Sequence, residues 1–450
     1  YLARVNYTLK HKYLFSLNAR VDGSSRFGAN NKYGFFPSAS AGWRISEEAF
    51  MESVKETISN LKLRASYGFT GNTEIGVYES LATLGTSNWI LGNQLVSGFF
   101  PNKIPNPDLK WERTGQFDVG LDLGLFNNRL RVTMDYYKKK TTDLLYNVAI
   151  PYTSGYDTML KNIGSLENHG YELSIESDNL TGPFSWTTAF NISFNRNKVL
   201  ELGGEEYKEM AEGDGHLKTG SVRRLIVGEP VGVFYGYRFD GIFQNEEECK
   251  QQTSSAAPIG VGLRRYKDLN GDGKVDAVND REILGNANPK FFGGLTNTFA
   301  YKGFELNVFL QYSVGNKILN YNAMELETPT GGQNAYADMV NRWTPENPSN
   351  IYPKATTNRN VLVSDRFIED GSYLKLKTLS LSYSFPKVNI KHIQGLRIYV
   401  TGQNLLTWTK YRGYDPEVSY RGASTLESGE DFGGYPQSRT FMLGVKLDIK

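Results

Sequence analysis

The sequence predicts an all-β protein, and specifically an antiparallel β-barrel that crosses a membrane. Segments of alternating apolar and polar residues recur along its 450 residues, and many approach the ~9–11 residues that a tilted membrane strand needs. Short turns alternate with very long loops, as in barrels with short periplasmic turns and long extracellular loops. Aromatic residues make up 13% of the chain, which fits the aromatic girdles of such barrels but also large soluble β proteins.

The C-terminal segment, residues 438–450, shows the alternation clearly. Successive side chains of a strand point to opposite faces, so one face of this segment is apolar and the other is largely polar. The apolar face holds Phe441, Leu443, Val445, Leu447 and Ile449, and the other holds Met442, Gly444, Lys446 and Asp448. A strand in a soluble sandwich can alternate in the same way. The recurrence of the pattern in strands too long for an ordinary sandwich favours the barrel.

Strands and loops alternate along the whole chain, and the pattern predicts roughly 13–14 strands. They cover residues 4–10, 13–21, 36–45, 61–67, 116–125, 129–136, 171–175, 186–194, 299–301, 304–312, 374–385, 396–401 and 438–450. Long loops, expected on the extracellular side, lie near residues 71–111, 141–162, 199–288, 315–371 and 409–437. These loops are polar and punctuated by glycine and proline, with little periodicity.

Two local features refine this assignment. Ser46 is expected to be the N-cap of a brief helical or turn segment over residues 47–55. Within residues 374–385 the apolar side chains change from one parity to the other. A β-bulge near Lys377-Thr378 would explain that change, because a bulge adds one residue to one strand of a pair.

The polar face of the strands at 116–125 and 129–136 indicates where water lies. Asp118, Asp122 and Asp135 are expected on this face together with Arg131. A packed soluble core would not hold these charges, because burying unpaired charge is costly. They suit a water-filled lumen, with the apolar face toward lipid.

Composition and missing motifs exclude several classes of function. The formal net charge of +2 argues against a nucleic-acid-binding protein, which usually carries a basic excess. One cysteine, Cys249, cannot form an intrachain disulfide, and no apolar run is long enough for a transmembrane helix. The sequence has no phosphate-binding loop, nucleophile elbow or zinc-protease helix, and its four histidines are scattered. We therefore expect no enzymatic activity and no required cofactor.

Residues 268–280 resemble a calcium-binding loop. Residues 268–276, Asp-Leu-Asn-Gly-Asp-Gly-Lys-Val-Asp, match the first nine positions of such a loop, in which alternate oxygens wrap a hard cation. The twelfth position is Asn279 rather than an acid, so Asp280 or Glu282 would have to close the loop. The candidate ligands are Asp268, Asn270, Asp272, Lys274, Asp276 and Asp280. We expect a structural ion here; the alternative is an Asp/Asn/Gly turn that needs no ion.

Aromatic side chains in the predicted loops are candidates for substrate contact. Aromatic rings supply a large contact area at low entropy cost and stack on sugars and peptides. The main candidates are Trp89, Phe99, Tyr235, Trp343 and Tyr420, and further ones are Phe100, Tyr237, Tyr336 and Tyr435. The alternative for each is packing of loop against loop, or against a partner protein.

Four segments resemble the SusC/RagA family of TonB-linked outer-membrane transporters. They are Asp-Gly-Ser-Ser-Arg-Phe-Gly at 22–28 with Phe-Pro-Ser at 36–38 and Gly-Trp-Arg at 42–44; Asn-Pro-Asp-Leu-Lys-Trp-Glu at 106–112; Asn-Ile-Gly-Ser-Leu-Glu-Asn-His-Gly-Tyr-Glu-Leu at 162–173; and Gly-Gln-Asn-Leu-Leu-Thr-Trp-Thr-Lys-Tyr at 402–411 with Gly-Tyr-Asp-Pro-Glu at 413–417. The blocks run from near the start of the chain to near its end, so the resemblance covers essentially all of it.

The resemblance implies a location, a mechanism and partners. The family has a 22-stranded barrel in the Gram-negative outer membrane, a plug domain in its lumen and a SusD-like surface lipoprotein as its lid. Import is driven through TonB, and the substrates are typically oligosaccharides or peptides. No plug or TonB-binding segment is recognisable in this sequence, so we expect the chain to be the C-terminal portion of the barrel.

Two other classes of function stay open on the sequence. A passive outer-membrane porin or surface adhesin could use the same barrel, and its ion conductance would not depend on TonB. A soluble, secreted β-rich protein that binds or cleaves glycans is the third hypothesis. That protein would be recovered in the aqueous phase without detergent.

Overall fold

The computed structural model describes residues 1–156, 158–210, 213, 216–217, 219–328, 334–357, 361–386, 392–418, 420–422, 424 and 426–449. The chain divides into two compact units, and each is described here by itself. Unit 1 comprises residues 1–177 and 195–206, and unit 2 comprises residues 178–194 and 207–450. Among the described residues, no helix has the length and apolar character needed to span a membrane.

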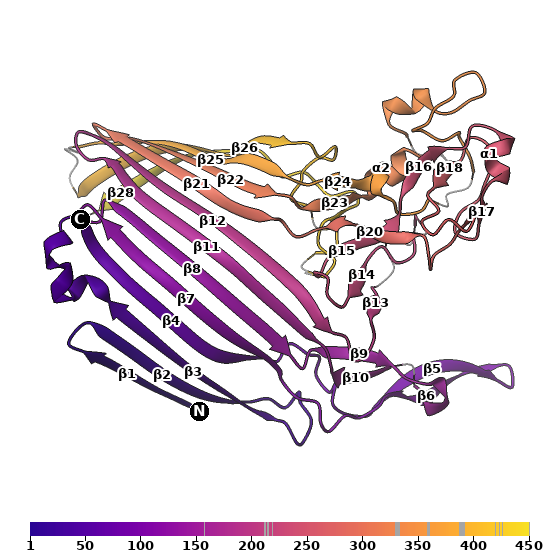
Figure 1. The fold of residues 1–450 in the computed structure, drawn as a ribbon, viewed down its shortest axis with the longest axis horizontal. Helices are drawn as coiled ribbons and strands as arrows, with labels where there is room; N and C mark the ends of the chain where they lie inside the picture. The colour runs from indigo at the N-terminus through magenta and orange to yellow at the C-terminus, as the bar shows by residue number, and fades with distance from the viewer. Residues whose placement is uncertain are drawn as a thin grey trace. The chain divides into compact units, whose positions relative to one another are not determined.

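Thirteen strands form one large sheet, which confirms the all-β prediction (Figure 1). In unit 1 the neighbouring strands are, in order, β1 (Leu2–Leu9), β2 (Tyr13–Gly23), β3 (Tyr33–Arg44), β4 (Ile58–Asn72), β7 (Glu112–Leu125), β8 (Leu130–Thr142) and most of β11 (Ser165–Leu180). In unit 2 they are the first part of β12 (Phe184–Glu201), up to residue 194, and then β21 (Phe291–Tyr301), β22 (Phe304–Val314), β25 (Tyr373–Ser384), β26 (Ile393–Thr409) and β28 (Thr440–Ile449). Strands that follow one another in this way pair antiparallel, as β7 and β8 do.

The polar face of the unit 1 sheet carries the charges that the sequence placed there. Arg64 on β4 lies 3.0 Å from a carboxylate oxygen of Asp122 and 2.9 Å from one of Asp135. On the next strands, Arg131 lies 3.0 Å from Glu176. Cross-strand pairs of opposite charge stabilise a sheet, so this face is polar without being a field of one sign.

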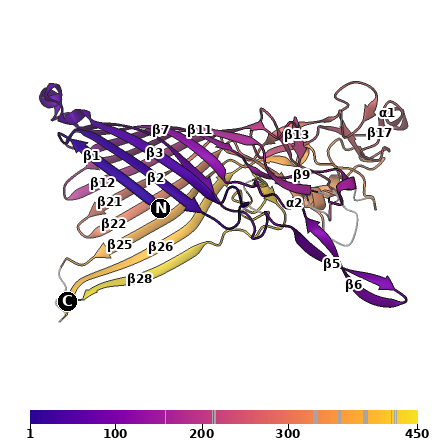
Figure 2. The ribbon, with the colours of Figure 1, turned by 90° about the horizontal axis from the view of Figure 1, so that it is seen from below.

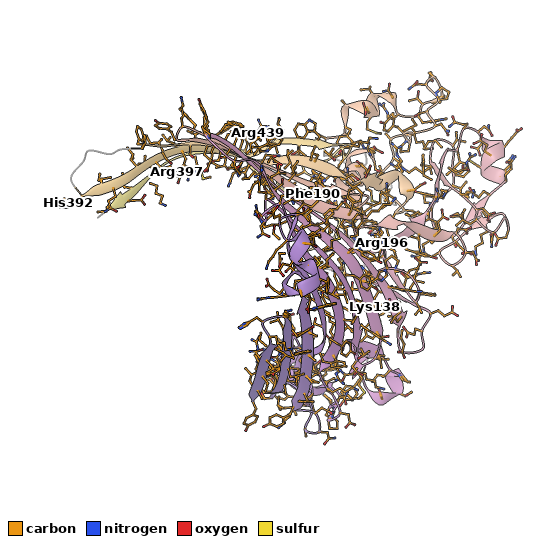
Figure 3. The ribbon with its side chains drawn as sticks, turned by 60° about the vertical axis from the view of Figure 1, so that its left-hand side comes forward. Lys138, Phe190, Arg196, His392, Arg397 and Arg439 are labelled. Atoms are coloured by element: carbon orange, nitrogen blue, oxygen red, sulfur yellow. The ribbon has the colours of Figure 1, made fainter. Side chains whose placement is uncertain are left out.

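Unit 2 confirms the predicted bulge. The pairing of β25 with β22 shifts between Leu376 and Thr378, so Lys377 is the extra residue there. The pairing with β26 shifts at the same place, but the extra residue lies on β26. Side chains project from both faces of these strands in Figure 3. Arg397 of β26, labelled there, lies 2.6 Å from Glu305 of β22, two strands away.

The predicted helical segment near residue 47 differs in detail. Two 3-10 helices form, η1 (Ile45–Glu47) and η2 (Ala49–Val54). Ser46 lies inside η1 and is buried, and Glu48 precedes η2. The N-cap assignment of Ser46 was therefore wrong. Glu48 instead accepts hydrogen bonds from Lys12, Tyr13 and Trp43, which hold the turn against the strand ends.

The sequences suggested irregular long loops, but the structure has short helices and strands within them. Unit 1 has the hairpins β5 (Thr83–Leu91) with β6 (Gln94–Lys103) and β9 (Leu145–Ala149) with β10 (Thr158–Asn162), and η3 (Tyr152–Ser154). Unit 2 has β13 (Tyr207–Glu209), β14 (Arg224–Ile226), β15 (Val233–Tyr237), β16 (Phe239–Ile242), α1 (Glu246–Lys250), β17 (Thr253–Ser254), β18 (Arg264–Tyr266), β19 (Lys274–Val275), β20 (Arg281–Asn286), β23 (Lys317–Asn320), α2 (Tyr321–Leu326), η4 (Ala337–Asn341), η5 (Asp365–Phe367), β24 (Ile368–Asp370) and β27 (Glu430–Asp431). Strands of two to six residues are too short for alternation to reveal them.

These short elements of unit 2 enclose a hydrophobic core of their own. Its centre is formed by Phe234, Leu319, Tyr321, Met324 and Phe367, all buried. A smaller cluster joins Tyr237, Tyr266, Val275 and Leu362. The loops of unit 2 are therefore a packed body rather than a set of separate excursions.

Candidate functional site

Two of the family-like segments meet in unit 1, at 22–28 and 106–112. The Gly28 N–H donates to the Leu109 carbonyl at 3.0 Å. A Cβ at position 28 would lie 2.0 Å from the Pro107 carbonyl oxygen, so only glycine permits this approach. Phe27 and Leu109 are buried beside the contact. The glycine of the first segment is thus explained by the close approach of the second.

A third family-like segment joins this contact through side-chain amides. The Asn106 side chain donates to the Leu160 carbonyl at 2.8 Å. Asn162 accepts from the Lys110 N–H at 2.9 Å and donates to the Lys110 carbonyl at 2.6 Å. We call residues 22–28, 106–112 and 160–162 the motif junction. It joins the ends of two long loops, and the contacts of Asn106 and Asn162 in it are neutral hydrogen bonds.

A cavity of about 730 Å³ lies beside the motif junction in unit 1. Its lining includes Asn18, Arg20, Asp22, Ser38 and Trp111. The Trp111 ring stacks on Phe27 with centroids 5.0 Å apart, so its position is fixed by the junction. The cavity combines polar side chains of the sheet with the aromatic rings of Phe36, Phe69 and Trp111, which is a composition that can bind a small solute.

The loops of unit 2 converge on the buried carboxylate of Glu430. The Arg223 Nε lies 2.8 Å from this carboxylate, although the two residues are 207 positions apart. Arg421 lies 3.2 Å from it, and the Tyr321 hydroxyl donates to it at 3.3 Å. Arg223 also donates to the carbonyls of Gly232 and Ser428. We call Arg223, Tyr321, Arg421 and Glu430 the Glu430 cluster.

A second set of ion pairs surrounds Glu327, which is 0% exposed. Its two oxygens accept from Arg412 at 2.9 Å and from Arg366 at 2.9 Å. Arg412 also pairs with Glu369 at 2.8 Å. Burial opposes the charged form of Arg412, but hydrogen bonds from its guanidinium to Glu369 and Glu327 outweigh this and raise its pKa.

The Gly-Tyr-Asp-Pro-Glu segment at 413–417 supplies a third set. Lys375 of β25 is 1% exposed, and its ammonium lies 2.6 Å from both Asp415 and Glu417. Lys377, the bulged residue, lies 2.7 Å from Glu417. Burial alone would raise the pKa of Glu417, but the hydrogen bonds from Lys375 and Lys377 outweigh it and lower that pKa. Two lysines of β25 thus pair with the same carboxylate.

The loop at 268–280 is closed by its own hydrogen bonds. Asp280 is buried and accepts from the N–H groups of Leu269 and Asp276, both at 2.7 Å. Asp268 accepts from Gly271 and Gly273 at 2.7 Å. No three acidic, histidine or cysteine side chains of the described residues are grouped to hold a metal ion. The calcium site therefore stays a prediction.

Two of the aromatic candidates lie on the β5–β6 hairpin of unit 1 (Figure 2). Trp89 is 61% exposed and lies over Gly98, and Phe99 is 74% exposed on the opposite hairpin face. No charged residue occurs between Ser80 and Asn102. Both faces of the hairpin therefore present apolar side chains, and these two candidates keep free ring surface.

The other three aromatic candidates belong to unit 2 and have close neighbours. The Tyr235 ring lies beneath the Arg224 guanidinium, 3.9 Å from its centroid. The Trp343 Nε1 donates to Gln244 at 3.0 Å. Tyr420 packs edge-on against Phe432, with centroids 5.6 Å apart. These contacts show what positions each ring, and contact with substrate stays a prediction for all five.

Comparison with known proteins assigns the chain. The family model described as "TonB dependent receptor-like, beta-barrel" matches residues 2–405. The chain belongs to this TonB-dependent receptor family. TonB-dependent receptor P3 of Formosa agariphila is 42% identical over 451 residues, which cover 99% of this chain and 45% of that protein.

The SusC/RagA type of TonB-dependent receptor, predicted from the motifs, is confirmed. TonB-dependent receptor SusC of Bacteroides thetaiotaomicron is 33% identical over 468 residues, covering 100% of this chain and 43% of that protein. The solved structure of the RagAB peptide transporter matches with a TM-score of 0.81 and 28% identity, covering 99% of this chain and 47% of that one. The chain thus spans less than half the length of these relatives.

Members of this receptor family are integral β-barrel proteins of the outer membrane, so the predicted location is confirmed. The motif junction explains the glycine and the asparagines of three family-like segments, because these residues make the contacts between the segments. Sequence reasoning missed Arg223 and Glu430, whose pairing across 207 positions leaves no local pattern. It could have found Asp415 and Glu417, since both stand in a recognised segment.

Proposed function

We propose that this chain is the C-terminal barrel portion of a TonB-dependent importer that takes up oligosaccharides or peptides. The observation that carries the proposal is the family match over residues 2–405, together with relatives named SusC and RagAB peptide transporter. The substrate would bind to loops and lumen surfaces, and the protein would catalyse no covalent reaction. Energy would come from TonB acting on a plug domain.

A SusD-like surface lipoprotein is the proposed partner of the loop side. The packed core of unit 2 supports this, because a lid needs a rigid surface to close upon. The Glu430 cluster and the Glu327 ion pairs hold that surface by contacts between distant segments. The loops of unit 2 would then act as a platform for the lipoprotein.

The test uses the complete protein in its native outer membrane. The protein is extracted in mild detergent and isolated by an affinity tag. Mass spectrometry should then find a surface lipoprotein in an amount equal to that of the barrel protein. The ligand of that lipoprotein would indicate the substrate class. Uptake of the ligand should stop when TonB is deleted. Recovery of the barrel alone, with ion conductance that does not depend on TonB, would instead favour a passive porin.

Calcium at residues 268–280 is kept as a proposal for a structural ion. The carboxylates of Asp268, Asp272 and Asp276 accept from backbone N–H groups, and their remaining lone pairs would bind the ion. Amide hydrogen exchange of this loop, measured in chelator and then in excess calcium, is the test. Exchange that is slower in calcium than in chelator, with no such difference in Asp272→Asn, would support a bound ion. Equal exchange rates in calcium and chelator would mean that the loop is closed by its own hydrogen bonds alone.

A further inference from the structure

Lysines lie on the apolar face of the unit 1 sheet, at the loop ends of its strands. Lys138 and Lys140 continue the alternation of the apolar side chains of β8, from Leu130 to Tyr136, so they project from the same face. The register agrees, because Phe117 of β7 lies directly opposite Lys138. Both lysines are exposed, and Lys138 is labelled in Figure 3. The face that is apolar along most of its height therefore ends in cations.

Neighbouring strands add arginines and a further lysine to this face. Arg113 of β7 has the same parity as Phe117, and its guanidinium lies 3.7 Å from the ring centroid of Phe69. On β12, which is next to β11 in the sheet, Arg196 and Lys198 are exposed and share a parity. We call Arg113, Lys138, Lys140, Arg196 and Lys198 the cationic band.

The cationic band has few carboxylates near it. Glu167 of β11 lies 3.0 Å from Lys138. Arg113, Lys140 and Lys198 form no ion pair with any residue that the structure describes. On the opposite face of β8, Arg131 shows the ordinary arrangement, since it lies 3.0 Å from Glu176. The cationic band therefore has positive charge available for a partner.

The position of the cationic band along the strands matches the level of lipid headgroups. At ~3.4 Å per residue, Leu130 and Lys140 are about 34 Å apart along β8. A strand tilt of about 40° turns this length into a rise of about 25 Å, which is the height of the apolar belt of a membrane barrel. The rings of Tyr136 and Tyr171, with centroids 5.0 Å apart, lie just below the lysines, as in an interfacial girdle. At the turn end of the same face, Leu125 lies opposite Leu130 and no cation is present in that pair.

We propose that the cationic band binds the phosphate groups of lipopolysaccharide, the lipid of the outer leaflet. The long loops of outer-membrane barrels are extracellular, which puts the loop ends of these strands in that leaflet. Lysine and arginine bind phosphate oxygens through charge-assisted hydrogen bonds. The apolar side chains below the band continue the same surface and would contact the acyl chains of the same lipid molecule. The inference rests on the outer-membrane location of the family and is independent of the proposed substrate and partner.

The test measures lipid binding to the complete protein, purified in mild detergent, by native mass spectrometry. The probes are diphosphorylated lipid A, the same lipid A without its phosphates, and phosphatidylglycerol. Diphosphorylated lipid A should bind most tightly, and its affinity should fall as the ionic strength rises. Equal binding of dephosphorylated lipid A would overturn the recognition of phosphate. Equal binding of phosphatidylglycerol would overturn lipopolysaccharide as the source of that phosphate.

Charge-removing variants locate the site on the cationic band. Lys140→Gln combined with Lys198→Gln should lower the affinity for diphosphorylated lipid A about 30-fold, since each cation near a lipid surface contributes about fivefold. Lys140→Arg should keep the affinity. Lys139→Gln is the matched control, because Lys139 projects from the opposite face of β8, with its ammonium 4.9 Å from the Tyr137 ring centroid.

Two results would contradict the proposal at this step. The first is lipid A binding that is unchanged in the double variant. The second is a protein, including a second copy of this one, that remains bound to the unmodified protein in place of lipid A and is lost from the double variant. The cationic band would then be a protein interface.

Discussion

Unit 1 and unit 2 both join loop segments that are far apart in sequence, but with different chemistry. The motif junction of unit 1 uses peptide groups and the amides of Asn106 and Asn162. The loops of unit 2 use buried ion pairs such as Arg223 with Glu430. A neutral hydrogen bond contributes about 0.5–1.5 kcal/mol, whereas removing one partner of a buried ion pair costs about 3–5 kcal/mol. One substitution in the motif junction should therefore lower its stability by a small amount. One substitution in a buried ion pair of unit 2 should lower the stability of those loops much more.

The largest effect is expected for Glu430→Gln. The change leaves Arg223 buried without a counter-charge, so the local free energy of opening should fall by about 3–5 kcal/mol. Amide exchange of β14 and β27 measures this. Arg238→Gln, which removes pairs of a half-exposed arginine, should cost about 1 kcal/mol or less. Equal effects of the two variants would remove the distinction between buried and exposed pairs.

A somewhat smaller effect is expected at the motif junction for Gly28→Ala. The new methyl group would meet the Pro107 carbonyl, and overpacking of this kind costs about 1–3 kcal/mol. Exchange of the amides at 24–31 is the measurement. Gly182→Ala is the control, because a Cβ there meets nothing within 4 Å. Little change at Gly28 would mean that the junction can shift, against the rigid contact described above.

Asn162→Ala should weaken the junction by less. The Lys110 N–H and carbonyl would lose their partner. Since water can replace it, the cost should be about 0.5–1.5 kcal/mol. The exposed Asn195, changed to alanine, is the comparison and should have almost no effect. Faster exchange confined to residues 106–112 is expected. A loss that spreads through unit 1 would show that the junction is cooperative, like the platform of unit 2.

The smallest expected effect is a pH dependence of amide exchange that unit 2 should show and the motif junction should not. The pKa of Glu417 is lowered in the folded protein, so its contribution is present above the ordinary value of 4.5 and is lost as the pH falls below it. Exchange near residues 411–417, corrected for its intrinsic pH dependence, should rise between pH 6 and 3.5. Glu417→Gln should remove that dependence. The amides held by the neutral side chains of Asn106 and Asn162 should show none. A parallel rise there would contradict the neutral character of these two contacts.

The sheet was predictable because its long strands repeat one simple pattern. Residues 116–125 alternate over a whole strand, so both strand and facing could be assigned from the sequence. The bulge at Lys377 was equally readable, since a change of parity has few other causes. Ser46 failed as an N-cap because Glu48, two residues later, binds three side chains of the strand ends and fixes the turn.

The loop body of unit 2 could not be predicted in the same way. Its strands are two to six residues long, and they exist because segments far apart pack on Phe234 and Tyr321. The partners of Glu430 come from separate loops, and no local pattern records such a contact. The five aromatic candidates were all chosen because they lie in predicted loops. In the structure their surroundings differ, because those surroundings depend on long-range packing.

The span between Arg223 and Glu430 also sets an order of assembly. The two residues are 207 positions apart, so the pair forms only when the last loop reaches the rest of unit 2. Until then the guanidinium has no carboxylate partner from the last loop and gains nothing from burial. A chain interrupted before residue 430 would keep this arginine in water and leave the core around Tyr321 open to quality-control proteases. The buried pair can therefore form only in a chain that contains the last loop.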